Sequence, residues 1–144
     1  MEARFNMQQA QPDAYKAMLG LEKYLNSTPL TNTHKDLIKI RASQINGCVY
    51  CLSMHTRDAR KNGETEQRIY LLNAWRECNL YTPEERAILA LTEQVTLISE
   101  HTGTDAYDEA AGLFSETYLA QILMEIITIN AWNRIGIISR LQPE

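Results

Sequence analysis

One long segment near the C-terminus constrains the fold of this chain more than any other feature. Between Tyr118 and Ile138, apolar residues cover most of the circumference of a helix, so most sides of that helix must be buried. A domain of 144 residues can hardly bury so long a helix alone, and we expect a homo-oligomer to cover part of it. A membrane-spanning helix rarely carries the polar residues found here, which are Gln121, Glu125, Asn130, Asn133 and Arg134.

Helix signals recur along the rest of the chain, and no segment shows the alternation typical of a strand. Thr82-Pro83-Glu84-Glu85 has an N-cap, a proline at the first helical position and a glutamate at the third. Thr33 is predicted to cap another helix, with Asp36 in a capping-box arrangement, and the chain is expected to break around His101-Thr102-Gly103-Thr104. The sequence therefore predicts one all-α domain over residues 1–144, a bundle of about six to seven helices at about 13–25, 33–45, 48–61, 66–78, 83–98, 105–113 and 115–138.

Charge and cysteine content limit the classes of partner and compartment. With 14 basic and 18 acidic residues the net charge is −4, so no basic field attracts nucleic acid or an anionic membrane. The N-terminal residues lack the apolar stretch of a signal peptide, and three cysteines do not form a structural disulfide framework. We therefore expect a cytoplasmic protein.

The segment from Gly47 to His55 carries the clearest chemistry. Cys48, Cys51 and His55 are spaced i, i+3 and i+7, so on a helix they point the same way within about 60°. The preceding Asn46-Gly47 is a helix stop, which places the cysteines in the first turn of a new helix. There the helix dipole favours a thiolate, and a histidine one turn away can accept its proton. A thiolate beside a second thiol is the arrangement needed for oxidation to a sulfenic acid and then to a disulfide.

Other uses of this segment fit less well. A structural zinc ion needs four ligands, and the segment offers three; Cys78, His34 or His101 would have to supply the fourth. A c-type haem needs histidine directly after the second cysteine, where Leu52 stands, and a thioredoxin domain needs a preceding strand. The two cysteines can also be plain core residues, with His55 incidental.

This region resembles the alkylhydroperoxidase D (AhpD)-like branch of the carboxymuconolactone decarboxylase family. The resemblance begins at Asp36 and runs through the R-x-S-Q-x-N-G and C-x-x-C-x-x-x-H motifs to residue 60, then over residues 63–68 and 74–77. The run Asn130-Ala131-Trp132-Asn133-Arg134 is also similar, so about half of the chain is covered.

The resemblance implies an all-helical fold that assembles through dimers or trimers into larger rings, commonly hexamers. It implies that Cys51 attacks the peroxide and that Cys48 resolves the sulfenic acid to a disulfide. His55 and an acidic residue twelve positions before Cys48, which is Asp36, would relay the proton. An external dithiol, such as a lipoylated protein or another thiol donor, would restore the reduced pair, with no cofactor or metal.

Two positions depart from the family pattern. The acidic residue is usually glutamate, and the shorter Asp36 needs a bridging water to reach His55 or Cys51, or serves only as a helix cap. Tyr50 stands where the peroxidase carries a histidine between the cysteines, and a tyrosine is a poor base near neutral pH.

The remaining polar and aromatic residues are given structural roles. Cys78 is predicted to be a packed thiol, and Trp75 and Trp132 to anchor the core or a subunit interface rather than line a pocket. His34 is expected to be exposed, and Arg41 to pair with a carboxylate.

The favoured hypothesis is a thiol-dependent antioxidant peroxidase that reduces organic hydroperoxides through a Cys48–Cys51 disulfide cycle. Two alternatives remain. One is a lyase of the carboxymuconolactone decarboxylase type with His55 as acid and base, although known decarboxylases of the family generally lack the cysteine pair. The other is a non-catalytic thiol sensor in which the disulfide changes assembly.

Overall fold

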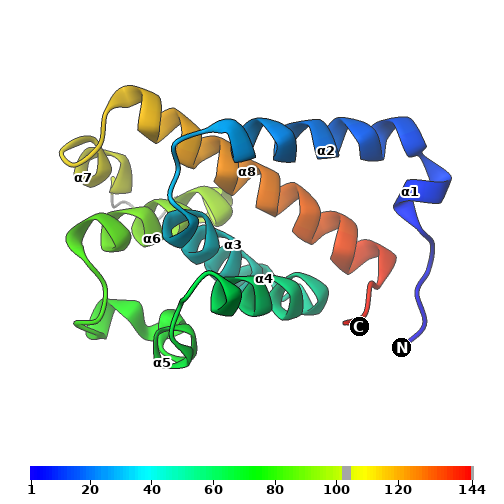
Figure 1. Cartoon of the computed structure of the whole chain (residues 1–144), viewed down its shortest axis with the longest axis horizontal. Coiled ribbons are helices and arrows are strands. Elements are labelled where there is room, and N and C mark those ends of the chain that lie inside the picture. The colour runs from blue at the N-terminus through cyan, green and yellow to red at the C-terminus, as the bar shows by residue number, and fades with distance from the viewer. Residues whose placement is uncertain (102–104, 144) are drawn as a thin grey trace.

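The long C-terminal helix predicted from the sequence organises the fold of the protein. The computed structural model describes residues 1–101 and 105–143. In it α8 spans Glu116–Ser139, and Ser115 caps it by accepting a hydrogen bond from the Tyr118 amide at 3.2 Å. Helix α2 (Pro12–Ser27) lies along α8, and α3 (Asn32–Asn46) crosses it from the other side (Figure 1).

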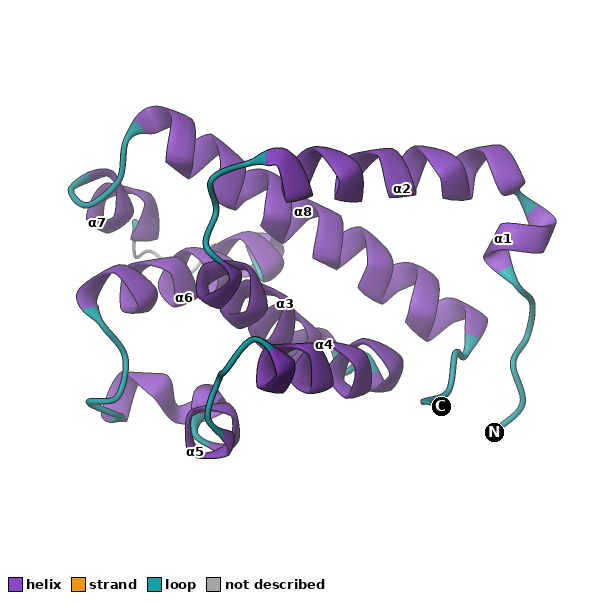
Figure 2. Cartoon of the chain, viewed as in Figure 1, coloured by secondary structure: helices purple, strands orange, loops and turns teal. Residues whose placement is uncertain are grey.

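The described residues form helices and loops only, as Figure 2 shows, which confirms the all-α prediction. Helix α3 is central because it packs against α4, α6 and α8. The two ends of the chain lie near each other at one end of the bundle (Figure 1). Besides the helices already given, the elements are α1 (Met7–Ala10), α4 (Val49–Lys61), α5 (Glu66–Tyr70), η1 (Leu72–Glu77), α6 (Pro83–Thr96), η2 (Ile98–Glu100) and α7 (Ala106–Ala111).

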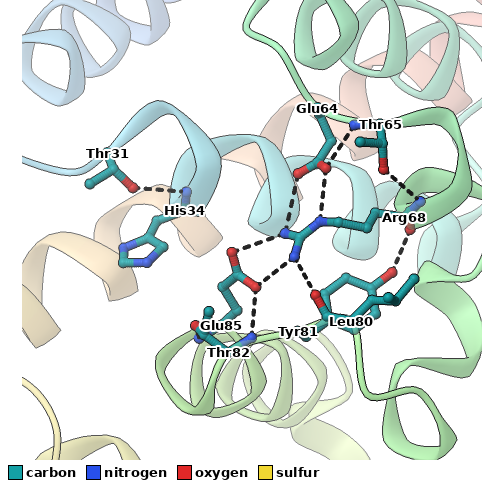
Figure 3. Close-up of polar contacts among 9 residues, drawn as sticks. All are labelled: Thr31, His34, Glu64, Thr65, Arg68, Leu80, Tyr81, Thr82 and Glu85. Carbon is teal, nitrogen blue, oxygen red and sulfur yellow. Dashed lines mark hydrogen bonds and ion pairs between the residues drawn. The ribbon is translucent and has the colours of Figure 1, made fainter.

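The sequence predicted the main helices, from α2 to α8, but it missed the short elements α1 and η2 and the break between α5 and η1. The predicted helix over 66–78 is two elements, because α5 ends at Tyr70 and η1 follows as a 3₁₀ helix. The Arg68 carbonyl, which would accept the next hydrogen bond of α5, instead accepts from the Tyr81 hydroxyl (Figure 3). A tertiary contact therefore ends this helix. The predicted break around His101 extends into residues 102–104, which lie outside the described residues.

The start of α3 is also a correction. The N-cap is Thr31 rather than Thr33, and the Thr31 hydroxyl accepts a hydrogen bond from the His34 amide at 3.1 Å (Figure 3). The predicted capping box with Asp36 is therefore wrong. The Tyr118 hydroxyl, 2.7 Å from His34 Nδ1, fixes this helix end against α8, so the histidine is half-buried rather than exposed.

Helix α8 is buried on one side only. Ile122, Ile126 and Ile129 are in the core, while Ile127 and Ile138 are 43% and 58% exposed. The expected oligomer stays a prediction. Among the described residues, no helix has both the length and the apolar character that crossing a bilayer requires.

Candidate active site

The two cysteines lie at the start of α4, in the turn that the sequence predicted. Gly47 ends α3 in the left-handed conformation with φ of 73°, a backbone shape that glycine adopts without steric cost. Cys48 is the N-cap of α4, and its sulfur accepts a hydrogen bond from the Cys51 amide at 3.4 Å. The first turn of α4 therefore directs one amide hydrogen to the Cys48 sulfur, and the start of the helix favours a thiolate at this position.

Cys48 and Cys51 are joined as a disulfide, with their Cα atoms 5.3 Å apart. Both side chains are buried, but their surroundings differ. Cys51 lines a cavity of about 700 Å³, whereas Cys48 is not among the residues that line it. A small molecule in this cavity would therefore lie against Cys51 and not against Cys48.

This large cavity lies between α1, α2, α4 and the C-terminal half of α8. Its volume is in the range of small-molecule sites. Trp132, predicted to anchor the core or an interface, packs against the core and also lines this cavity, where its indole donates to Glu22 Oε1 at 3.0 Å. Much of the wall is apolar or aromatic, formed by Tyr15, Leu19, Tyr50, Met54, Trp132 and Ile135.

Residues near both termini complete the wall of the large cavity. Arg4 holds the N-terminal segment against the end of α8, because its amide donates to the Ser139 carbonyl at 2.9 Å. Its guanidinium also donates to the Ile138 carbonyl at 3.1 Å. Met7 of α1 and Leu141 of the C-terminal tail lie on the wall as a result.

His55 lies one turn beyond Cys51 on α4 and lines the same cavity. It also lines a second cavity of about 270 Å³, so the imidazole lies between the two spaces. Burial lowers the pKa of His55 to about 4, and the nearby positive charge of Lys39 acts in the same direction, against Asp58. The ring is therefore neutral at physiological pH.

Asp36 lines the smaller cavity with His55. Its side chain is 5% exposed, and Oδ2 accepts a hydrogen bond from Asn62 Nδ2 at 2.8 Å. Burial raises the pKa of Asp36, while this hydrogen bond and Lys39 lower it. The structure thus brings Cys48, Cys51 and His55 together on α4, and Asp36 of α3 lines the same small cavity as His55.

The R-x-S-Q-x-N-G motif and the run Asn130–Arg134, both named in the sequence analysis, are joined by side-chain hydrogen bonds. Asn46 Nδ2 donates to Asn130 Oδ1 and to Asn133 Oδ1, both at 2.9 Å. Asn133 Nδ2 in turn donates to Ser43 Oγ at 2.9 Å. These bonds tie the end of α3, just before the cysteines, to α8. These hydrogen bonds between two separated motifs therefore fix the residues that precede the disulfide.

Three further residues near the site were missed by the sequence analysis. Gly136 of α8 lies against the disulfide, and a Cβ there would be 3.1 Å from Cys48 Sγ and 3.7 Å from Cys51 Sγ. Lys39 lines both cavities, and its ammonium pairs with the buried carboxylate of Glu125 at 3.5 Å. The sequence did offer one signal for Glu125, because a carboxylate is out of place in the largely apolar segment Tyr118–Ile138.

The other predicted side chains have the following places. Trp75 is in the core, as predicted, and Arg41 pairs with Glu93, its Nε lying 3.0 Å from Oε1. Cys78 is a free, half-buried thiol packed against the core. Within the described ranges, no group of three or more His, Cys, Asp or Glu side chains is arranged to hold a metal ion.

Comparison with known proteins gives the family. A model of the carboxymuconolactone decarboxylase family matches residues 12–94. The uncharacterized protein YdfG of Bacillus subtilis (strain 168) is 45% identical over 138 residues, which cover 95% of this chain and 94% of that protein.

Solved structures give the same assignment. A protein of unknown function from Agrobacterium tumefaciens, suggested to be the antioxidant defence protein AhpD, is 40% identical with a TM-score of 0.95 and 99% of each chain covered. The debrominase Bmp8 bound to 2,3,4-tribromopyrrole shares the fold alone, at 23% identity and a TM-score of 0.85, with 95% of this chain and 74% of that chain covered. This chain belongs to the carboxymuconolactone decarboxylase family and is AhpD-like.

Proposed function

We propose that the protein is a thiol-dependent peroxidase that reduces organic hydroperoxides through a Cys48–Cys51 dithiol–disulfide cycle. The observation that carries this proposal is the asymmetry of the pair. Cys51 lines a cavity large enough for an organic molecule, whereas Cys48, joined to it by the disulfide, is not among the residues that line that cavity. An attacking thiol needs access to the oxidant, whereas a resolving thiol needs access only to the first sulfur.

The first step is attack by the Cys51 thiolate on the terminal oxygen of the hydroperoxide. A sulfur–oxygen bond forms, the oxygen–oxygen bond breaks, and the alkoxide leaves as an alcohol after it takes a proton. The neutral His55 imidazole lines the same cavity, so it accepts the Cys51 proton and returns it to the alkoxide. Asp36, beside His55 in the smaller cavity, is the partner that relays protons to the ring.

The second step closes the disulfide. The Cys48 sulfur attacks the Cys51 sulfenic acid, a sulfur–sulfur bond forms, and hydroxide leaves as water with the Cys48 proton. The hydroperoxide has then been reduced to an alcohol and water, and two thiols have been oxidised. An external dithiol of the lipoyl or small-thiol class reduces the pair again.

The cavity wall favours organic hydroperoxides over hydrogen peroxide. Side chains such as Leu19, Met54 and Ile135 offer apolar contact to an alkyl or aryl group. Tyr50, between the two cysteines, lines the same wall as an aromatic surface and not as a base. Hydrogen peroxide gains nothing from these contacts.

The direct test is mass spectrometry of the reduced protein after one equivalent of an aryl hydroperoxide. We expect a single disulfide between Cys48 and Cys51. Cys51→Ser should abolish peroxide consumption, and Cys48→Ser should accumulate a Cys51 sulfenic acid or a mixed disulfide. Cys78→Ser is the matched control and should consume peroxide like the parent protein, because Cys78 lines neither cavity. Undiminished consumption by Cys51→Ser would contradict the proposal.

The homo-oligomer expected from the sequence belongs to this proposal. The exposed apolar side chains of α8, among them Leu123, Ile127 and Ile138, offer a surface for a second copy. Light scattering of the reduced and oxidised protein measures the assembly. A size that changes with the disulfide, together with no peroxide consumption, would favour the thiol sensor over the peroxidase.

A further inference from the structure

A buried ion pair beside the redox site is unusually poor in hydrogen bonds. Lys39 Nζ lies 3.5 Å from Glu125 Oε1, and the Glu125 side chain is 1% exposed. Within the described residues, neither Glu125 oxygen has a hydrogen-bond partner of ordinary geometry. Burying two charges in this way costs free energy that such a pair barely recovers. A role other than stability is therefore the better explanation for this pair.

The two charges of the pair are placed differently with respect to the site. Lys39 lines the large cavity with Cys51 and His55, and it lines the small cavity with Asp36 and His55. Glu125 lines neither cavity, because it approaches Lys39 from α8. Lys39 therefore shares a cavity wall with the reacting groups, while its ammonium is paired with a carboxylate that lines neither cavity.

Before the Cys51 proton is transferred, His55 supplies no positive charge to the site. A thiolate is stabilised by a neighbouring positive charge, and in many thiol enzymes an imidazolium supplies it. Here burial and Lys39 keep His55 neutral until it takes the Cys51 proton, so the first turn of α4 and a permanent cation are the groups that favour ionisation beforehand. Among the described residues that line the large cavity, Lys39 is the one lysine or arginine.

We propose that the Lys39 ammonium, anchored by Glu125, stabilises the thiolate form of Cys51. This inference deepens the proposed function, since it takes Cys51 as the attacking thiol. Deprotonation of Cys51 places a negative charge on the wall that Lys39 shares, and attraction between the two charges lowers the cost of ionisation. His55 then moves the proton, and Lys39 holds the charge.

The carboxylates around Lys39 have other partners, and two of them, Glu22 and Asp58, also line the large cavity. Glu22 of α2 accepts from the Trp132 indole, and Asp36 accepts from Asn62. Asp58 of α4 lies 3.9 Å from the Lys61 ammonium. Lys35 of α3, one turn before Lys39, lines only the small cavity. Lys35 therefore serves as a control for Lys39, because it lies on the same helix but does not line the large cavity with Cys51.

The test measures the thiolate directly and uses no peroxide. Reduced full-length protein is alkylated with iodoacetamide from pH 5 to pH 10, and the Cys51 peptide is quantified by mass spectrometry. We expect Lys39→Met to slow Cys51 alkylation about tenfold at pH 7, because less thiolate is present. The rates of parent and variant should converge near pH 10, where the thiol is ionised in both. Lys39→Arg should restore most of the rate, and Lys35→Met should behave like the parent.

Lys39→Met leaves the Glu125 carboxylate buried without a partner, which can destabilise the fold. The double variant Lys39→Met/Glu125→Met removes both charges and should show the same slow alkylation. Parental pH profiles in both variants, or an equal effect of Lys35→Met, would overturn the inference. Either result would leave peroxide consumption to be judged separately by Cys51→Ser. A slowed profile in a protein that consumes no peroxide would support the inference while the proposed function failed.

Discussion

Two clusters of charged residues in this protein differ in how completely their hydrogen bonds are made. At the first, Arg68 donates to Glu64 and to both oxygens of Glu85, while its carbonyl accepts from Tyr81 (Figure 3). At the second, the Glu125 carboxylate has the Lys39 ammonium at 3.5 Å and no ordinary hydrogen bond in the described part of the chain. Both clusters are largely buried.

The difference separates a structural role from a functional one. A buried ion pair stabilises a fold only when its geometry is good and its other donors and acceptors are also hydrogen-bonded. The Arg68 cluster meets that condition. It joins α5 to the capping box of α6, since Glu85 also accepts from the Thr82 amide at 2.9 Å. The Lys39 cluster does not meet the condition, but it lies where two cavities and the redox residues meet.

The largest expected effect is on stability at the first cluster. Arg68→Met removes the bonds to two carboxylates whose side chains are only 8% and 9% exposed, and it leaves both unpaired. We expect a loss of about 3–5 kcal/mol in the free energy of unfolding, measured by urea denaturation. A variant that lost less than about 1 kcal/mol would break the comparison, because the cluster would then not stabilise the fold.

The second expected effect is a pH dependence of stability at the redox site. The pKa of His55 is about 4 in the folded protein and about 6.5 in the unfolded chain. As pH falls from about 6.5 to 4, the unfolded chain binds a proton that the folded protein does not, so stability declines. His55→Gln should remove this decline, which amounts to as much as about 3 kcal/mol.

The measurement is urea unfolding of both proteins at several pH values between 4 and 7. The buried acids Asp36 and Glu125 have raised pKa values and act in the opposite direction, so the difference between parent and variant is the quantity to follow. His101→Gln, at an exposed site, is the control for loss of a histidine and should leave the decline in place. A constant difference between parent and His55→Gln across this range would show that His55 is not held neutral.

The sequence predicted best where a local signal decides the structure. The capping box at Thr82 and the stop at Gly47 are where the sequence placed them, and the last helix starts within one residue of the predicted residue 115. Each depends on residues within a few positions, which a pattern can represent. The stop at Gly47 in turn fixed the cysteines in the first turn of α4.

Predictions failed where a residue far away in the sequence determines which of two locally possible structures forms. Both Thr31 and Thr33 can cap a helix, and the Tyr118 hydroxyl beside His34 selects the first. Glu125 was recognised only as a polar residue in an apolar segment, since nothing near it in the sequence identifies Lys39 as its partner. The redox motif was therefore predictable from the sequence. The ion pair and the cavities around it were not, because they depend on how α3 packs against α8.

The third expected effect compares two helical glycines. A Cβ at Gly136 would lie 3.1 Å from Cys48 Sγ, whereas one at Gly20 of α2 would meet no atom within 4 Å. Alanine favours a helix by about 1 kcal/mol relative to glycine, and crowding in a packed site costs about 1–3 kcal/mol. Gly20→Ala should therefore stabilise the protein by about 1 kcal/mol, and Gly136→Ala should destabilise it by about 1 kcal/mol. Equal gains in thermal unfolding would mean that the space beside the disulfide is not tight.

The smallest expected effect on stability comes from deleting the second cluster outright. Lys39→Met/Glu125→Met replaces the under-bonded pair with apolar side chains of similar volume, and the free energy of unfolding should change by no more than about 1 kcal/mol or should rise. The removed attraction between the two charges is offset because neither group needs to leave water any longer. Urea denaturation beside Arg68→Met measures the contrast. A loss as large as that of Arg68→Met would mean that the two clusters stabilise the fold alike, and the distinction between a structural cluster and a functional one would then fail.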